Sequence, residues 1–225
     1  VFTSVAYIGF NTVSEQRLAE NIFGRRMSPH GLISVGINVV ADADWVDVKR
    51  KYNLPEEYLL YVGRIDKGKL NHIVQYFLHY KARYANSKLK FVLVGGLFSA
   101  LVSHSDLIYT GFVSENEKYA IIRHAKIMVN PSKFESLSLI LLEGMQLGKP
   151  MLVNGKCEVL KEHCSKSEKA ALAYWNKNDF ISKLASLETS SELCREMGKK
   201  GKVYVETYYS WSVIMERLKK AIESV

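Results

Sequence analysis

The sequence has no apolar segment long enough to cross a membrane. Its longest nearly apolar run, residues 91–102, is broken by Gly95, Gly96 and Ser99, whereas a spanning helix needs about 20 apolar residues. A secretory signal with a charged start and an apolar stretch is also missing at the amino end. We therefore expect no membrane span. The chain begins with Val1, and peripheral attachment to a membrane through a part upstream of it stays open.

Cysteine is scarce as well. The three cysteines are Cys157, Cys164 and Cys194, an odd number without a C-x-x-C pair. This usage is typical of unpaired thiols in a reducing compartment, and we expect a cytoplasmic protein, free or at the cytoplasmic face of a membrane. Cys157, His163 and Cys164 are too few ligands for a structural metal site.

Negative charge is in the minority. Lys and Arg number 31 against 23 Asp and Glu, so the net charge is +8. A basic surface attracts nucleic acids, anionic lipids or phosphorylated small molecules. The lysines are scattered and no recognition-helix motif accompanies them, which argues against a nucleic-acid partner. A G-x-G-x-x-G fingerprint for dinucleotides is absent too.

The pattern that is present alternates short apolar runs with longer amphipathic stretches. Nearly continuous apolar runs are typical of parallel strands covered on both faces, and strand–helix alternation predicts βαβ units. The expected fold class is therefore α/β, with a doubly wound parallel sheet. The predicted strands are residues 58–62, 89–94, 107–109, 127–130 and 150–153.

Helix signals fill the intervals. Ser114-x-x-Glu117 is a capping box, a helix over 138–147 ends at Gly148, and the last 35 residues have a helical apolar pattern. Residues 1–45 predict a separate βαβ unit with strands at 5–9 and 32–40 and a helix opened by Thr12. A polar linker follows at 41–44. It contains a D-x-D tripeptide, which we set aside as a metal site because it lies far from the predicted sheet edge.

Ligands of open parallel sheets bind outside the carboxyl ends of the strands. Strand 58–62 is followed by Arg64 and by two lysines, Lys67 and Lys69. A guanidinium and an ammonium at this edge suit a diphosphate, although a solvated basic turn has the same composition. Strand 127–130 is followed by a helix that Ser136 or Ser138 can cap, and the free N–H groups at such a helix start bind phosphate.

Two glutamates flank that helix start. Glu135 precedes it, and Glu143 lies eight positions further on. Eight positions along a helix correspond to about 12 Å of rise. This separation is too large for the carboxylate pair of a glycosidase. We expect them to bind different parts of one extended ligand. Glu143 lies among apolar neighbours, so its carboxylate needs a partner.

In order and spacing, these segments resemble the retaining glycosyltransferases of family 4, which have the GT-B fold of two Rossmann-like domains facing across a cleft. The Glu135/Glu143 pair matches the E-x7-E motif of that family. The other matching segments are Gly63-Arg64…Lys69, Val94-Gly95-Gly96, Gly111-Phe112-Val113-Ser114, Asn130-Pro131-Ser132 and Gly148-Lys149-Pro150.

The resemblance implies a role for each matching residue. Arg64 and Lys69 would hold the diphosphate and stabilise charge on the leaving nucleotide, and Glu135 would face the transferred sugar; these three are the implied catalytic residues. Glu143 would bind the ribose hydroxyls. The other implied donor-binding residues are Gly63, Phe112, Val113, Ser136, Leu137, Ser138 and Leu139.

The resemblance also implies substrates and organisation. The donor would be a UDP- or GDP-sugar and the acceptor a glycan or a lipid-linked group, with no metal or other cofactor. Residues 46–207 would be the donor-binding domain, residues 1–45 the tail of the acceptor-side domain with its connector, and residues 208–225 a helix that crosses back to that domain. The rest of the amino-terminal domain would be a partner.

The sequence departs from the family at two places. Ser136-Leu137-Ser138 stands where the family has Gly-Phe-Gly, so side chains narrow the expected sugar pocket. The loop between Arg64 and Lys69 is short, which leaves Lys67 as an alternative phosphate ligand. These departures keep a second hypothesis open, a non-catalytic nucleotide-sugar-binding or scaffold module.

Overall fold

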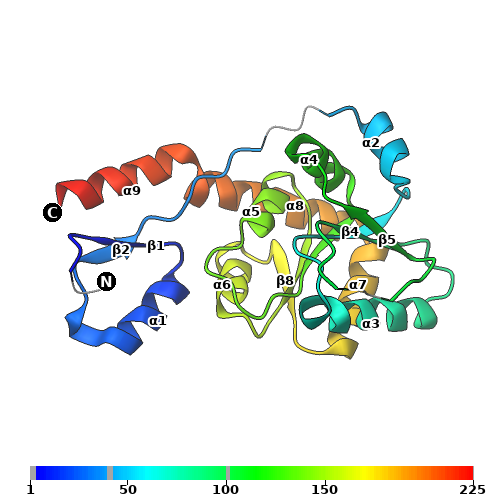
Figure 1. Ribbon diagram of the computed structural model, residues 1–225, viewed down its shortest axis with the longest axis horizontal. Coiled ribbons are helices and arrows are strands. Elements are labelled where there is room, and N and C mark those ends of the chain that lie inside the picture. Colours follow the sequence, from blue (N-terminus) through cyan, green and yellow to red (C-terminus); the bar gives the residue numbers. More distant parts are fainter. Residues whose placement is uncertain (1–3, 40–42, 100–101, 225) are drawn as a thin grey trace.

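A computed structural model describes residues 4–39, 43–99 and 102–224. Its larger part is a six-stranded parallel sheet with the strand order β5-β4-β3-β6-β7-β8, flanked by helices (Figure 1). This confirms the α/β fold with a doubly wound parallel sheet. The strands are β3 (Tyr58–Val62), β4 (Lys90–Val94), β5 (Leu107–Gly111), β6 (Ile127–Asn130), β7 (Met151–Asn154) and β8 (Ala171–Tyr174).

The sheet is buried on both faces because alternate side chains of each strand enter different cores. Tyr58 and Leu60 of β3 belong to a core that includes residues of α4, α5 and α8, whereas Leu59 and Tyr61 belong to one with residues of α3 and α7. The helices are α2 (Trp45–Tyr52), α3 (Lys67–Arg83), α4 (Glu115–His124), α5 (Leu139–Gln146), α6 (Glu158–Lys166), α7 (Lys177–Thr189), α8 (Ser191–Tyr209) and α9 (Trp211–Glu223).

The strand order creates a crevice between β3 and β6. From β3 the chain moves outward to β4 and β5 and then returns to place β6 on the other side of β3. The connections after β3 and after β6 therefore leave the sheet in opposite directions. Ligands of open α/β sheets bind at such a switch point, which here lies between the loops that follow Val62 and Asn130.

The strand predictions are accurate in the centre of the sheet. The bounds of β3 and β6 are those expected. β4 and β5 differ by one or two residues at one end, and β7 differs by one residue at each end. β8 was not predicted, because two of its four residues, Ala171–Tyr174, are alanines, which are depleted in strands, and because it follows a charged turn. The three cysteines are unpaired, as expected.

The amino-terminal prediction is only partly right. A small parallel pair does form, from β1 (Ile8–Phe10) and β2 (His30–Leu32), with α1 (Val13–Phe23) and a 3-10 turn (Gly24–Arg26) between them. The expected strand 32–40 is wrong in the described residues: Ser34 has φ +70°, and both Ile33 and Ser34 donate to the Phe10 carbonyl, which ends the ladder. The expected strand 5–9 begins later, at Ile8.

The predicted linker 41–44 is also corrected at its end. Asp44 is the N-cap of α2, and its side chain accepts the N–H groups of Val46 and Asp47. Residues 41 and 42, including the first aspartate of the D-x-D tripeptide, lie outside the described residues. In the described part of the chain, no helix combines the length and the apolar character that crossing a membrane requires.

Candidate functional site

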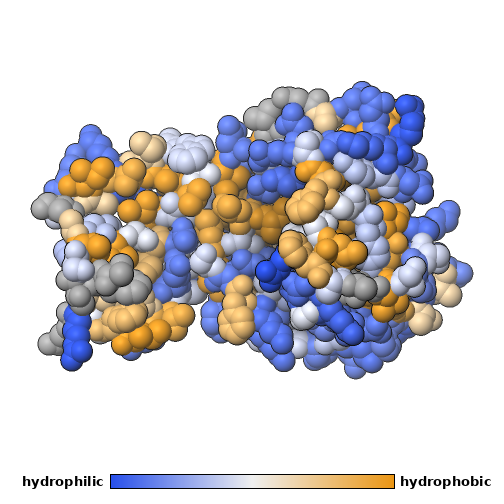
Figure 2. Space-filling view, viewed as in Figure 1, coloured by the Kyte–Doolittle hydropathy of each residue, from blue (hydrophilic) through white to orange (hydrophobic). Residues whose placement is uncertain are grey.

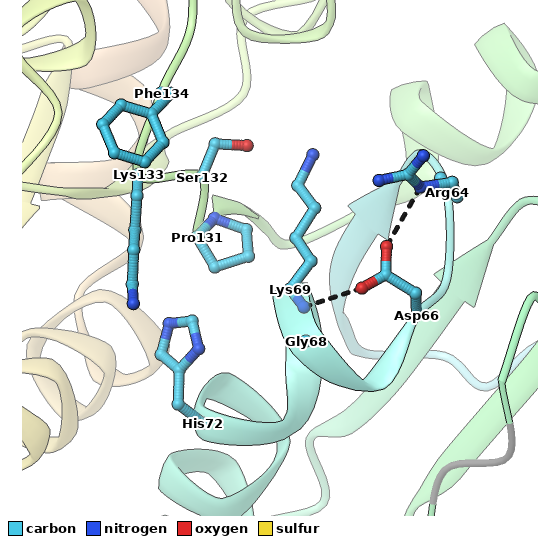
Figure 3. A pocket seen from close by; sticks show the side chains of 9 residues that line it. All are labelled: Arg64, Asp66, Gly68, Lys69, His72, Pro131, Ser132, Lys133 and Phe134. Carbon is cyan, nitrogen blue, oxygen red and sulfur yellow. Dashed lines mark hydrogen bonds and ion pairs between the residues drawn. The ribbon is translucent and has the colours of Figure 1, made fainter.

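A cavity of about 350 Å³ lies in the crevice between the loop after β3 and the loop after β6 (Figure 3). The start of α3 supplies Lys69 and His72, and the loop after β6 supplies residues 131–134. Arg64 stands at one side of the cavity. The sheet therefore brings Arg64 and the β6–α5 loop to the same edge, although they are far apart in the sequence.

An aspartate organises the cationic side of this cavity. The Asp66 carboxylate accepts the Lys69 backbone N–H at 2.8 Å, which makes Asp66 the N-cap of α3, and it also accepts a hydrogen bond from Arg64 Nε at 3.0 Å. The hydrogen bond from Lys69, with help from Arg64, lowers the pKa of Asp66. Asp66 is therefore ionised at neutral pH and fixes the Arg64 guanidinium beside the cavity.

The two candidate lysines differ in position. Lys69 is half-buried, lines the cavity, and places its ammonium 6.0 Å from the centre of the Tyr61 ring. Lys67 is exposed and is not among the residues that line the described cavity. The fold thus places Lys69, and not Lys67, in the same cavity lining as Arg64.

Asn130, the last residue of β6, ties the following loop together. Its Nδ2 donates to Ser138 Oγ at 2.8 Å and to Glu135 Oε1 at 3.3 Å, and its Oδ1 accepts the Ser132 N–H at 2.9 Å. These bonds curl residues 132–138 back over the end of the strand. They hold Glu135 near the start of α5.

The start of α5 differs from the expected serine cap. Ser138 is the N-cap, but its side chain accepts from Asn130 rather than from the helix, and its φ of +69° lies in the left-handed region, where a non-glycine residue is strained. Ser136 does not cap the helix either. The first helical hydrogen bonds come from Leu141 and Leu142 to the Ser138 carbonyl.

This start of α5 leaves backbone N–H groups free to donate hydrogen bonds. In the described chain, the backbone N–H groups of Leu137, Ser138 and Leu139 donate to no protein acceptor. Such N–H groups at a helix start attract anions, because the helix dipole is positive there. These are the N–H groups that the sequence predicted as phosphate ligands.

The buried His163 holds the β6–α5 loop through a hydrogen bond to its backbone. Burial lowers the pKa of His163 to about 4, so the ring is neutral at pH 7. Its Nε2 lies 2.8 Å from the Leu137 carbonyl, which can only accept, so Nε2 carries the proton. Nδ1 then accepts from the Tyr204 hydroxyl at 2.9 Å. His163 thus anchors the segment that presents the free N–H groups.

Glu143 has the partners that its apolar setting required. Its Oε1 accepts from Lys118 Nζ at 3.0 Å, and the Tyr119 hydroxyl lies 3.2 Å from this oxygen and 2.9 Å from Glu115 Oε1. Oε2 of Glu143 has no hydrogen bond within the described residues. Lys118 also lines a second cavity, of about 400 Å³, together with Gly63, Arg64, Gly95, Phe112 and Val113. Glu143 therefore belongs to the side of the site where Phe112 lies exposed.

Glu135 belongs to a third cavity, of about 640 Å³, between the β6–α5 loop and α1. Ser136 lines it with Glu135, and Ser14 and Leu18 face them from α1. Arg64 lines the first and second cavities, and Lys133 and Phe134 line the first and third. The three cavities are thus consecutive, and the two glutamates stand at opposite ends.

Sequence reasoning missed three side chains of this site. Lys133 lies in the same loop as Glu135 and could have been included on that ground. His72 and Lys118 lie in the second turns of α3 and α4, and nothing in their local sequence distinguishes them from ordinary helix residues. Within the described residues, no cluster of three or more His, Cys, Asp or Glu side chains is arranged to hold a metal ion.

Comparison with known proteins assigns the chain to a family. A family model described as glycosyl transferases group 1 matches residues 46–204. Sucrose-phosphate synthase from Thermosynechococcus elongatus is similar over 99% of this chain and 59% of its own, with a TM-score of 0.77 and 17% identity.

Two further solved structures share the fold. The UDP-forming α,α-trehalose-phosphate synthase from Burkholderia vietnamiensis matches 98% of this chain and 59% of its own, with a TM-score of 0.74 and 13% identity. WaaG, a glycosyltransferase of lipopolysaccharide biosynthesis, matches 93% of this chain and 60% of its own, with a TM-score of 0.71 and 15% identity. The chain spans less than two thirds of the length of each of these structures. By the match over residues 46–204, the chain belongs to the glycosyl transferases of group 1.

Proposed function

We propose that this chain is the donor-binding part of a retaining glycosyltransferase of family 4. It would bind a UDP- or GDP-sugar and, with an amino-terminal domain, transfer the sugar to a glycan or lipid-linked acceptor in the synthesis of a surface glycan or polysaccharide. The observation that carries the proposal is the position of Arg64, which borders two consecutive cavities at the switch point of the sheet.

The central cavity suits a diphosphate. Arg64 and Lys69 line it, and the free N–H groups of residues 137–139 belong to the loop that closes it. A guanidinium binds pairs of phosphate oxygens, and fixed N–H donors stabilise the charge that develops on a leaving nucleotide. Neither a metal nor another cofactor has a part in this proposal.

The second cavity suits the nucleoside. Phe112 is 81% exposed at its edge and offers a ring on which a base can stack, and the Val113 main chain lies beside it. Lys118 and Tyr119 orient Glu143 through Oε1. Oε2 remains to accept hydrogen bonds from the ribose hydroxyls. At the other end, Glu135 would face the sugar that is transferred.

Calorimetry with UDP and GDP tests the proposal. We expect one of the two to bind, and we expect Arg64→Gln and Lys69→Gln each to weaken it by about tenfold or more, because each removes a charge-assisted phosphate contact. Lys67→Gln is the matched control, since it removes the same charge from the same helix outside the cavity. A folded chain that binds neither nucleotide would falsify the proposal.

A second candidate is a non-catalytic nucleotide-sugar-binding or scaffold module. The observation in its favour is the Ser136-Leu137-Ser138 segment, whose last residue holds a left-handed conformation without being glycine. The two candidates differ in turnover. If the full-length protein binds nucleotide but releases none from UDP- or GDP-sugars in the presence of a range of glycan acceptors, the module is the better description.

A further inference from the structure

Two phenylalanine rings lie exposed in the second cavity, in the loops that follow β4 and β5. Phe98 is 66% exposed and Phe112 is 81% exposed, and both line the cavity. Gly96 lies against both rings: a Cβ built on it would lie 2.4 Å from Phe112 Cζ and 3.1 Å from Phe98 Cε2. Because both rings approach the same point, they are neighbours, and the missing side chain at Gly96 makes room for them. We call Phe98 and Phe112 together the ring platform.

The backbone holds the Phe98 side of the ring platform close to Arg64. The Phe98 N–H donates to the Ile65 carbonyl at 2.8 Å, and the Ile65 N–H donates to the Gly96 carbonyl at 2.9 Å. These two hydrogen bonds join the loop after β4 to the loop that carries Arg64. The guanidinium carbon of Arg64 lies 5.9 Å from the centre of the Phe98 ring. The ring platform therefore lies at the border of the second cavity with the central cavity, which Arg64 also lines.

The second cavity has few polar side chains in its lining. In the described part of the chain they are Arg64 and Lys118. Arg64 donates to Asp66 at 3.0 Å, and Lys118 donates to Glu143 at 3.0 Å, so both cations are already engaged by carboxylates. A ligand that fills the space between them meets ring faces and apolar side chains. It does not meet a pattern of side-chain donors and acceptors that could distinguish one base edge from another.

We infer that the ring platform favours a purine base, so that of the two proposed donors the GDP-sugar is the one that binds more tightly. The inference rests on the proposed function, which places the nucleoside in this cavity. Every base can stack on an aromatic ring, because every base has a π face, and the gain grows with the apolar area that is covered. A purine has two fused rings and covers both phenylalanines, whereas a pyrimidine has a single ring and covers one of them.

Calorimetry of the chain with GDP, ADP and UDP tests this inference. We expect GDP and ADP each to bind at least about fivefold more tightly than UDP, because stacking does not depend on the polar groups at the base edge. The variant Phe98→Leu keeps an apolar side chain but removes the ring, and in it the purine preference should fall to about twofold or less.

Inorganic diphosphate separates stacking from an effect on Arg64. It has no base, and its affinity is measured by displacement of GDP. We expect it to bind equally to the native chain and to Phe98→Leu, because Arg64 and Lys69 are both kept. Tyr208→Leu is the matched control: it removes an exposed ring of α8 that lines none of the three consecutive cavities, and it should keep the native purine preference.

The possible results separate this inference from the proposed function. UDP that binds as tightly as GDP overturns the inference and leaves the proposed function intact. A preference that survives in Phe98→Leu, or that holds for one purine alone, also overturns it, because the selectivity would then lie outside the ring platform. Equal losses of GDP and diphosphate affinity in Phe98→Leu overturn it as well, because Phe98 would then act through Arg64. A folded chain that binds neither UDP nor GDP contradicts both.

Discussion

Among single residues, His163 shows how a side chain remote from the ligand shapes the site. It is fully buried, and both ring nitrogens are used, by the Leu137 carbonyl and the Tyr204 hydroxyl. Tyr204 lies 3.3 Å from the Tyr209 hydroxyl, and the Tyr209 carbonyl accepts the Ile37 N–H. These hydrogen bonds, together with Tyr209 itself, therefore join the β6–α5 loop to α8 and to the segment that leaves the β1–β2 pair.

The low pKa of His163 makes the stability of the chain depend on pH. The folded state has a pKa of about 4 for this ring against an ordinary value of 6.5, so only the unfolded state takes up the proton between these values. The free energy of unfolding should be unaffected above pH 7 and should fall by about 2 kcal/mol by pH 5. Chemical denaturation at pH 7 and pH 5 measures this change.

Two variants identify the source of the pH effect. His163→Asn removes the titrating ring, so its stability, although lower at pH 7, should change less between pH 7 and pH 5. His79→Asn removes an exposed histidine of α3 and should keep the native pH dependence. Equal pH dependence in the native chain and in His163→Asn would show that His163 is not the group responsible.

Among the elements, the contact between α5 and α8 positions α5 at the edge of the candidate site. Gly198 of α8 stands directly against Gly148, just past the end of α5: a Cβ at residue 198 would lie 2.3 Å from the Gly148 carbonyl oxygen. Gly201, one turn further along α8, faces the backbone of Met145, where an added Cβ would lie 3.2 Å from its Cα. The missing side chains allow α8 to support α5 closely on the face away from the ligand.

Substitution of Gly198 should disturb this contact. Alanine is favoured over glycine in a helix by about 1 kcal/mol, but here its methyl group would overlap backbone atoms that cannot rotate away. We expect Gly198→Ala to lower the free energy of unfolding by about 1–3 kcal/mol, the usual cost of overpacking. Thermal unfolding measures the loss. Lys199→Ala, at the exposed neighbouring position, is the control, and a native-like midpoint for Gly198→Ala would contradict the close packing.

At the scale of the whole molecule, the amino-terminal unit docks on the sheet domain through its helix start. Glu162 of α6 accepts the N–H groups of Val13 and Ser14 at 3.2 and 2.7 Å, together with the Ser14 hydroxyl. Thr12 Oγ donates to the Ser136 carbonyl at 3.1 Å. The third cavity lies between these two units, so their attachment determines its shape.

Removal of the Glu162 charge should loosen that attachment. Burial alone would raise the pKa of Glu162, but hydrogen bonds from Lys166 and Ser14 outweigh it and keep the pKa low. Glu162→Gln keeps the shape and loses the charge that faces the positive end of α1. We expect amide hydrogen exchange in α1 to become about tenfold faster, with little change in α7. Glu158→Gln on the same helix is the control, and unchanged exchange in α1 would contradict the role of Glu162.

Large apolar side chains remain exposed on this part of the molecule. Figure 2 shows them gathered over α1 and α9, and they include Leu18, Ile22, Met215 and Ile222, each more than half exposed. Among the described residues of α9, Ile214 and Ala221 are buried, and of these Ile214 belongs to the predicted apolar face. The assignment of residues 1–45 to the tail of an acceptor-side domain with its connector, and of residues 208–225 to a helix that crosses back to that domain, remains a prediction.

The sequence by itself determined the central sheet and most of the candidate residues. Uninterrupted apolar runs can be satisfied only by burial on both faces, so β3 and β6 were predictable to the residue, and the side chains that follow them had to lie at one edge. It could not determine the bounds of the small β1–β2 pair, because strands of three residues owe their register to neighbours rather than to their own pattern.

Only the tertiary structure decided which distant side chains meet at the site. It placed Lys69 rather than Lys67 in the lining of the central cavity, joined Lys118 to Glu143, and brought His72 and Lys133 to the same cavity. These choices depend on the rotation of α3 and α4 about their axes and on the path of the β6–α5 loop. Both are fixed by packing against the sheet, which no local pattern of residues encodes.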